Sequence, residues 1–362
     1  MRPSKKINVI LPFIVNTGGI KQALEYSRVF QNDGYEVAVF YPWIKYKEYY
    51  DLKNILLAVF AHYNSPAVFF KKLFRRFSGK NNAKTSRDEI LRFVRVPLIS
   101  RPFIPPADFV IATSWTTANS VAKLPSKCGE KVYFIQGHEI WGGFKERVER
   151  TYSLPMKLVT ISPWLTAVVE TLSKRKITAE IHNGINLRIF KPSIKNRDRL
   201  RILMPYHFLP QKASMQGIKV LRSISKKFPE VEVNLFGLFN NPNEGDFYNY
   251  HHNPEPDRLV ELYQQSHIML YPSLEEGWGL PILEAMACKC AVVANDMGCV
   301  PILNDGKNML ISKSFDFNEL ERHITYLIEN PDELARISEN GYRTALGFDV
   351  GVQARKFMGI FK

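Results

Sequence analysis

The stretch Tyr271-Pro-Ser-Leu-Glu-Glu-Gly-Trp-Gly-Leu-Pro-Ile-Leu-Glu-Ala-Met-Ala-Cys288 is the most informative part of this 362-residue sequence. An apolar run ends at Tyr271, and a glycine-rich turn leads to Pro281, a residue type favoured in the first turn of a helix. We therefore expect a strand, a tight turn and a helix over Pro281–Cys288. Backbone N–H groups at such a turn, beside the positive end of a helix, suit a phosphate group.

Short apolar runs alternate with helical patterns along the rest of the chain. In the first half, an apolar run at Ile7–Val15 is followed by two glycines and by helical spacing over Ile20–Asp33. Further strands are expected, in order, at Glu36–Tyr41, Asp108–Thr113, Lys131–Gln136 and Lys157–Ile161. Strands that alternate with helices in this way form a doubly wound parallel sheet.

The second half repeats this organisation. Its strands are expected at Leu200–Pro205, Glu232–Phe236, His267–Tyr271, Ala291–Ala294 and Asn308–Ile311, and further helices at Gly217–Phe228 and Pro256–Gln265. The sequence therefore predicts an α/β protein of two Rossmann-like domains, residues 1–185 and 200–345, which face each other across a cleft. Residues 186–199 are expected to link them, residues 46–106 to form a basic insertion, and residues 346–362 to form a C-terminal helix that returns to the first domain.

The composition excludes several classes of protein. Hydrophobic residues make up 45% of the chain, which is typical of globular proteins. The longest apolar run, Ile55–Ala61, is too short to span a bilayer. The four cysteines are too few and too unfavourably spaced for a disulfide framework or a structural zinc site, so we expect reduced thiols in a cytoplasmic protein.

Two carboxylates bracket the predicted junction of turn and helix. Glu276 lies in the loop, and Glu284 follows about one turn inside the helix. Carboxylates repel phosphate but accept paired hydrogen bonds from a vicinal diol. A nucleotide-sugar carries diols on both sides of a pyrophosphate and fits this arrangement. The alternative, with Glu276 as a helix-start charge and Glu284 as a surface residue, explains each glutamate alone but not the whole block.

The block resembles the donor-site signature of glycosyltransferase family 4, the retaining group 1 glycosyltransferases of the GT-B fold. The family pattern is Glu-Gly-Phe-Gly-Leu-Pro-x-x-Glu-Ala-Met-Ala, and this sequence reproduces it with Trp278 in place of Phe. The stretches Ile181–Asn186, with Phe190 and Pro192, and Gln136–Glu139 are also similar to segments of that family. The donor-binding residues that the resemblance implies are Gly18, Gly19, His207, Lys212, Glu276, Gly277, Trp278, Gly279, Leu280 and Glu284.

Two positions depart from the family pattern. The family's second domain opens with an arginine and, five positions later, a lysine, which together hold the donor diphosphate; here they are His207 and Lys212. Histidine is a weaker cation whose charge depends on pH. Ile302 stands where the family often carries a glutamate. We therefore expect reduced or altered donor binding.

The resemblance also implies a mechanism with Lys212, Glu276 and His138 as catalytic residues. Lys212 would stabilise charge on the departing nucleoside diphosphate. His138 would orient a sugar hydroxyl or the acceptor, although a satisfied histidine at a strand end explains it equally well. Attack from the same face, with the leaving phosphate assisting deprotonation, would retain the anomeric configuration. No Asp-x-Asp sequence occurs, so we expect no metal and no cofactor.

The net charge of +14 is concentrated in one segment, Phe69–Arg101, which holds ten basic and two acidic residues. Phenylalanines are interleaved with the charges, as in segments that lie on an anionic membrane. We expect a membrane or acceptor contact through Lys71, Lys72, Arg75 and Arg76. A solvated basic loop and a nucleic-acid-binding surface are the alternatives.

The expected function is a retaining hexosyl- or deoxyhexosyltransferase. It would move a sugar from a nucleotide-sugar to a glycan or lipid-linked glycan in surface polysaccharide synthesis, at the inner face of the cell membrane and without a nucleic-acid partner. The alternatives are an inverting GT-B transferase or a sugar-nucleotide epimerase. A basic nucleic-acid-binding protein is an alternative of another class, but it gives no role to Glu276 and Glu284.

Overall fold

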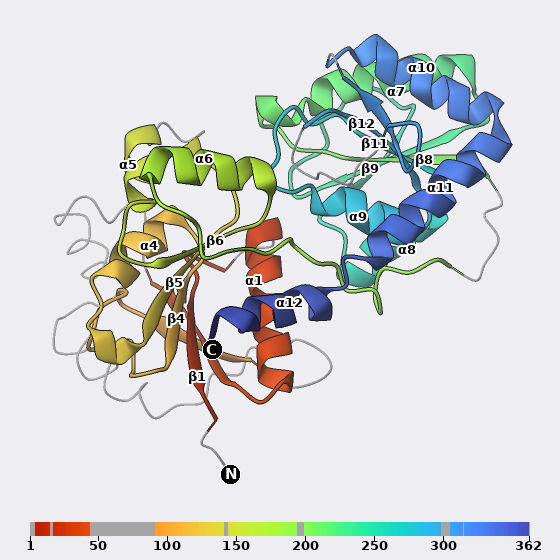
Figure 1. The fold of residues 1–362 in the computed structure, drawn as a ribbon. Helices are drawn as coiled ribbons and strands as arrows, with labels where there is room; N and C mark the ends of the chain where they lie inside the picture. Colours follow the sequence, from red (N-terminus) through yellow and green to blue (C-terminus); the bar gives the residue numbers. More distant parts are fainter. Residues whose placement is uncertain are drawn as a thin grey trace, which may run out of the picture. The chain divides into compact units, whose positions relative to one another are not determined.

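The computed structural model describes residues 4–14, 17–43, 91–140, 144–193, 199–297, 305–313 and 315–361. These residues form two compact units (Figure 1). The first takes in the described parts of Met1–Ile161, Leu165–Ile181 and Ala354–Lys362, and the second comprises Ser162–Trp164 and the described parts of His182–Gln353.

The first unit is built on a parallel sheet whose described strands follow the order β3-β2-β1-β4-β5-β6-β7. Ile7 of β1 lies opposite Val37 of β2 on one side and Phe109 of β4 on the other. The strands are β1 (Lys6–Ile10), β2 (Glu36–Pro42), β3 (Arg92–Val96), β4 (Phe109–Ala112), β5 (Glu130–Ile135), β6 (Lys157–Thr160) and β7 (Ala179–Glu180). The central strands β1 and β4 are almost entirely buried because helices cover both faces of a sheet of this kind.

Helices and short 3-10 turns alternate with these strands. They are α1 (Gly18–Asn32), α4 (Trp115–Ala122), η2 (Ser126–Cys128), α5 (Lys145–Thr151), α6 (Pro163–Ser173), α12 (Val350–Met358) and η5 (Gly359–Phe361); the first residues of α6 and of α12 belong to the second unit. The last turns of α12 complete this unit's core, although they come from the end of the chain (Figure 1). The ring of Phe357 packs edge-on against Phe134 of β5, with centroids 5.2 Å apart, and also contacts Tyr26 and Phe30 of α1.

The second unit contains a parallel sheet in the order β10-β9-β8-β11-β12-β13. Its strands are β8 (Arg201–Pro205), β9 (Glu232–Gly237), β10 (Asn249–His252), β11 (Ile268–Tyr271), β12 (Ala291–Asn295) and β13 (Leu310–Ser312). The helices are η4 (Pro210–Lys212), α7 (Ser214–Lys227), α8 (Pro256–Gln265), α9 (Leu280–Ala287), α10 (Phe317–Glu329) and α11 (Pro331–Leu346). Because β8 and β11 are hydrogen-bonded neighbours, the loops that follow them lie at the same edge of the sheet.

One glycine allows helix α7 to approach this edge closely. A Cβ atom at Gly217 would lie 2.6 Å from the sulfur of Met204 and 2.8 Å from the ring of Pro272. Met204 belongs to β8, and Pro272 directly follows β11. Gly217 therefore lets the first turn of α7, with the loop that precedes it, pack on the loop that follows β11.

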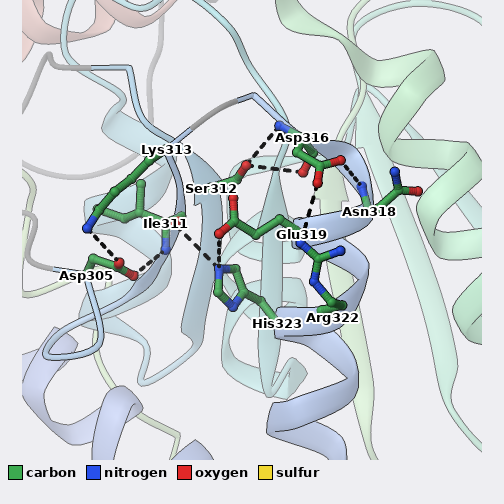
Figure 2. Close-up of polar contacts among 9 residues, drawn as sticks. All are labelled: Asp305, Ile311, Ser312, Lys313, Asp316, Asn318, Glu319, Arg322 and His323. Carbon is green, nitrogen blue, oxygen red and sulfur yellow. Dashed lines mark hydrogen bonds and ion pairs between the residues drawn. The ribbon is translucent and has the colours of Figure 1, made fainter.

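Polar contacts fix the start of α10, the helix that follows β13 (Figure 2). The side chain of Asp316 caps the helix by accepting a hydrogen bond from the backbone N–H of Asn318 at 2.9 Å. Ser312 at the end of β13 donates to the Asp316 carbonyl and accepts from its N–H. His323, about two turns further along α10, has its Nε2 3.4 Å from the carbonyl oxygen of Ile311. These contacts satisfy backbone groups at a helix start and account for the cluster without a ligand.

The expected fold class is confirmed, with local differences. The first strand ends at Ile10, before Pro12, instead of continuing to Val15. Residues 46–106 are not wholly an insertion, because Arg92–Val96 within them is strand β3, paired in parallel with β2. The strand expected at Asn308–Ile311 is displaced to Leu310–Ser312.

Candidate functional site

The quoted block forms the predicted strand, turn and helix. Strand β11 ends at Tyr271, and helix α9 begins at Leu280 after Gly279. Gly279 has φ 84° and ψ 47°, in the left-handed region that only glycine adopts without strain, and Pro281 lies in the first turn of the helix. Gly277 lies in the same turn, so the glycines give the loop its sharp entry into α9.

Lys212 and Glu276 form the charged centre of this loop. The Nζ atom of Lys212 lies 2.7 Å from Oε1 of Glu276 and 3.4 Å from the carbonyl oxygen of Glu275. The hydroxyl of Tyr271 donates to the same Oε1 at 2.6 Å. The side chain of Glu276 is 12% exposed and that of Lys212 is 29% exposed. The structure thus brings together two of the residues that the sequence singled out, and adds Tyr271.

The backbone also joins the two loops that carry these charges. The N–H of Leu274 donates to the carbonyl of Gln211 at 2.8 Å, and the hydroxyl of Ser273 lies 3.3 Å from the same oxygen. Ala213, directly after Lys212, has φ 47° in the left-handed region, which is unfavourable for a residue with a Cβ atom. The turn that presents Lys212 is therefore held in a specific conformation against the loop after β11.

Glu284 lies inside the protein. It is 5% exposed, so its interpretation as a surface residue of an amphipathic helix is wrong. The hydroxyl of Tyr263 on α8 donates to Oε2 of Glu284 at 3.1 Å. Burial raises the pKa of Tyr263 well above its usual value, and the carboxylate of Glu284 raises it further, so this hydroxyl stays protonated and continues to donate. Phe190 packs edge-on against the Tyr263 ring, with centroids 5.9 Å apart.

Trp278 is buried, with 3% of the residue exposed. Its ring stacks on that of His182 at 4.8 Å between centroids and lies 5.7 Å from Phe348. A side chain with so little exposure has almost no surface for a ligand to contact. Trp278 would therefore affect a ligand indirectly, by holding the loop in place. The resemblance identified Trp278 as a donor-binding residue, and the structure places its side chain in the packing beneath the loop.

His207 follows β8 and lies beside Phe208 and Phe239, with ring centroids 5.0 and 4.7 Å away. Its Nδ1 accepts a hydrogen bond from the N–H of Leu209 at 3.1 Å, so the hydrogen of the neutral ring lies on Nε2. The backbone N–H of His207 donates to the hydroxyl of Ser214. The N–H of Leu209 therefore orients the ring, and the start of α7 holds the backbone of His207.

The charge on His207 is disfavoured at neutral pH. Burial lowers its pKa below the usual value, and the positive charge of Lys212 lowers it further, whereas Glu276 acts in the opposite direction. An arginine at this position would stay charged. His207 thus supplies a neutral ring where the resembled family carries a permanent cation.

Gly18 and Gly19 lie in the first unit as the first two residues of α1. The side chain of Gln136, after β5, donates through Nε2 to the carbonyl oxygen of Gly19 at 3.0 Å. A Cβ at Gly19 would lie 3.5 Å from the Gln136 side chain, an ordinary contact. The glycine loop expected after β1 is therefore a helix start that contacts the loop after β5.

His138 lies in that same loop after β5, with its Nε2 3.5 Å from Oε1 of Glu149 on α5. Its neighbour Glu139 has a carboxylate 3.5 Å from the backbone N–H of Trp115 at the start of α4. Burial raises the pKa of Glu139 to about 7, and the hydrogen bond from Trp115 opposes this shift. The sequence analysis quoted Glu139 only as part of a motif and missed it as a titrating group; its place beside His138 at a strand end was the available signal.

Other expected site residues lie outside the described residues. These are Lys71, Lys72, Arg75 and Arg76, and also Ile302. Among the residues that the structure does describe, no group of three or more His, Cys, Asp or Glu side chains could hold a metal ion. In the same part of the chain, no helix is both long enough and apolar enough to cross a membrane.

Comparison with known proteins finds a family match in the second unit. Residues 186–344 match the family described as "Glycosyl transferases group 1". Two curated relatives are an N,N'-diacetylbacillosaminyl-diphospho-undecaprenol alpha-1,3-N-acetylgalactosaminyltransferase of Campylobacter jejuni and an MMP alpha-(1->4)-mannosyltransferase of Mycolicibacterium hassiacum. The first is 30% identical over 28% of this chain and 28% of its own length. The second is 25% identical over 57% of this chain and 53% of its own length. The chain thus spans about half or less of these relatives.

The fold is similar to that of solved glycosyltransferase structures. Anabaena HepE, solved in complex with UDP and glucose, superposes with a TM-score of 0.73 at 14% identity, over 98% of this chain and 99% of its own. The resemblance to group 1 glycosyltransferases and the GT-B fold are therefore confirmed, and residues 186–344 match the model of that family. Assignment to family 4 in particular stays a prediction.

Proposed function

We propose that this protein is a retaining glycosyltransferase that moves a sugar from a nucleotide-sugar to a glycan or lipid-linked glycan acceptor. The observation that carries the proposal is the contact between Lys212 and Glu276, which come from the loops after β8 and β11. A cation and a carboxylate side by side, next to a glycine-rich helix start, can receive a phosphate and a sugar hydroxyl of one ligand.

The donor half of the proposal rests on the second unit. Lys212 would bind the diphosphate, assisted by backbone N–H groups where α9 begins at Leu280. Glu276 and Glu284 would each accept hydrogen bonds from a diol. Two observations support a nucleotide-sugar: the match of residues 186–344 to group 1 glycosyl transferases and the UDP and glucose bound to HepE.

The acceptor half of the proposal rests on the names of relatives and on the basic segment. The Campylobacter relative is named for an undecaprenol-diphosphate-linked substrate, and an Escherichia coli relative, 35% identical over 21% of this chain, is an O-antigen chain mannosyltransferase. Surface polysaccharide synthesis at the cytoplasmic face of the cell membrane is consistent with these names. The basic segment Phe69–Arg101 would then face anionic lipid or a phosphorylated acceptor.

The proposed reaction needs no protein nucleophile. The bond between the sugar's anomeric carbon and the β-phosphate oxygen breaks, and the acceptor oxygen bonds to the same face of that carbon. The acceptor proton passes to the departing phosphate. Lys212 is then most important as the phosphate gains negative charge. His138 would orient the acceptor or a sugar hydroxyl.

A thermal-shift screen of nucleotide-sugars tests the proposal. A ligand that binds only the folded protein raises its melting temperature, by an amount that follows its concentration over Kd. We expect one nucleotide-sugar to stabilise the wild-type protein and to be consumed when an acceptor extract is added, with the product anomer identified by NMR. Absence of a shift with every nucleotide-sugar and nucleoside diphosphate would contradict the proposal.

Metal independence forms part of the proposal and has its own test. Transfer should continue in EDTA at the rate measured without chelator. A loss of activity that Mg²⁺ or Mn²⁺ restores would show that a cation takes part in holding the diphosphate.

A further inference from the structure

Oxygen Oε1 of Glu276 has two donors that come from different elements. Tyr271 is the last residue of β11, and Lys212 is the last residue of the 3-10 turn η4. Their distances to this oxygen are 2.6 and 2.7 Å. Both fall in the range of hydrogen bonds that are strengthened by a full charge.

The two donors differ in how firmly they are anchored. Strand β11 lies between β8 and β12, and all four of its residues are buried. Tyr271 is 6% exposed, so water competes little for its hydroxyl. Lys212 is more exposed, and its side chain carries a mobile ammonium group with three donors. The tyrosine can therefore stay in place while the lysine changes its partner.

A bound diphosphate would compete for Lys212. In the structure, this ammonium group lies 2.7 Å from Oε1 of Glu276 and neutralises its charge. When it turns to a phosphate, the carboxylate loses its cation, and a largely buried carboxylate without a partner is costly. A second donor that does not depend on Lys212 reduces this cost and keeps Glu276 oriented toward the sugar.

We propose that Tyr271 is a positioning residue that holds Glu276 in place when Lys212 is released to the donor diphosphate. The inference rests on the proposed function, because it assumes that a nucleotide-sugar binds at Lys212 and Glu276. Tyr271 itself need not touch the substrate. It acts through Glu276, and the variant Tyr271→Phe removes its hydroxyl while keeping the ring.

Binding of a nucleoside diphosphate, measured by calorimetry, tests the inference without requiring turnover. In Tyr271→Phe, Lys212 is the remaining donor that we identify at Oε1 of Glu276. The carboxylate then holds Lys212 more firmly, and a bound phosphate must draw Lys212 away from it. We expect affinity for the nucleoside diphosphate and kcat/KM for transfer both to fall, by about 10- to 100-fold for the latter. Circular dichroism and the melting temperature check that the variant folds.

A double-mutant cycle with Glu276→Ala identifies the route of the effect. If Tyr271 acts through the carboxylate, Tyr271→Phe should change diphosphate affinity by less than about 2-fold when Glu276 is already alanine. Tyr248→Phe is the matched control. Tyr248 is also largely buried. Its hydroxyl donates to Oδ1 of Asn241 at 2.7 Å and accepts from the N–H of Glu244, so its hydrogen bonds involve neither Lys212 nor Glu276. Loss of this hydroxyl should leave diphosphate binding unchanged.

The outcomes separate the inference from the proposed function. If the wild-type protein binds no nucleoside diphosphate or nucleotide-sugar, the proposed function fails. If the wild type binds and transfers, but Tyr271→Phe is silent or has the same effect with and without Glu276, the positioning role of Tyr271 is overturned while the function stands.

Discussion

At the level of single residues, the histidine at position 207 makes the proposed phosphate-binding part of this site unusual. Burial and Lys212 lower the pKa of His207, and Nδ1 already accepts a hydrogen bond from Leu209. The neutral ring therefore contributes no charge near neutral pH. We therefore expect diphosphate binding at this loop to depend mainly on the charge of Lys212.

Replacing His207 with arginine should add a permanent cation beside Lys212. We expect His207→Arg to retain or raise donor affinity and to flatten the pH dependence of the rate below about pH 6.5, where the wild-type histidine gains its proton, because a guanidinium stays protonated throughout. Steady-state kinetics across that range measure both effects. Loss of donor binding in a folded variant would contradict the alignment of His207 with the family arginine.

Glu139 should make stability depend on pH. Its pKa is raised from 4.5 to about 7 in the folded protein, so the protonated carboxyl favours folding. This stabilising contribution is fully present below pH 4.5, the pKa of the carboxyl in the unfolded chain, and is lost as the pH rises through about 7, its pKa in the folded protein. Glu139→Gln should therefore raise the free energy of unfolding more at about pH 8 than at about pH 5, by roughly 1–3 kcal/mol.

Urea unfolding at the two pH values measures this difference. Glu146→Gln is the control, because Glu146 is exposed on α5 and should give a smaller difference between the two conditions. An equal effect of both substitutions at both pH values would show that the Glu139 carboxyl does not titrate near neutrality.

At the scale of elements, the buried side chain of Trp278 holds the loop between β11 and α9 in place. The indole stacks on His182 and lies beside Phe348, so the loop is joined to two segments distant in the sequence. Trp278→Ala would remove a buried aromatic ring, and we expect a loss of about 3–5 kcal/mol in the free energy of unfolding.

Trp278→Phe is the matched variant, because it keeps an aromatic ring and restores the residue of the family pattern. It should lose clearly less stability than the alanine variant and keep donor binding. Urea denaturation and the KM for the donor measure the two properties. Equal losses in both variants would mean that the aromatic stack does not support the loop.

The elements differ in how readily the sequence predicts them. Strand β11 and helix α9 could be predicted because a buried apolar run, a glycine turn and Pro281 occur in succession. Strand β10 was not found, since Asn249–His252 is a polar edge strand without an apolar pattern. Strand β3 was not found because Arg92 and Arg95 made it part of a basic segment.

The site shows the same limit. Glu276, Glu284 and Lys212 could be singled out as candidate site residues because their types and spacing match a known pattern. Tyr271 and Tyr263, which donate to the two glutamates, gave no signal, since a tyrosine at the end of a strand or inside a helix is usual in any core. Contacts between residues that lie in different elements depend on packing, and sequence spacing does not specify them.

At the scale of the whole molecule, the net charge of +14 predicts binding to an anionic surface. The charge is densest around Lys71, Lys72, Arg75 and Arg76, and four such residues near an anionic leaflet contribute about 1 kcal/mol each. We expect the protein to sediment with anionic vesicles at low salt, to be released at high salt, and to stop binding when these four residues become glutamates.

A control variant with the same change in net charge, made at other positions, shows whether vesicle binding depends on the position of the charges or only on the net charge. The exposed lysines of the second unit that serve as this control are Lys219, Lys226, Lys307 and Lys313. Their replacement with glutamate should preserve most of the vesicle binding. Binding that is insensitive to salt and to the substitutions at residues 71–76 would exclude this mechanism and favour a water-soluble acceptor.

The account depends most on the claim that Lys212 and the two glutamates hold the donor nucleotide-sugar. The most direct measurement is the rate of donor consumption by the wild type and by Lys212→Ala, Glu276→Ala and Glu284→Ala, each checked for folding by its melting temperature. Each removes a charge-assisted contact worth roughly 1.5–3 kcal/mol, so kcat/KM should fall by about 10- to 100-fold or more. For Lys212→Ala the loss should appear mainly in kcat. Folded variants that turn over the donor at the wild-type rate would contradict the account.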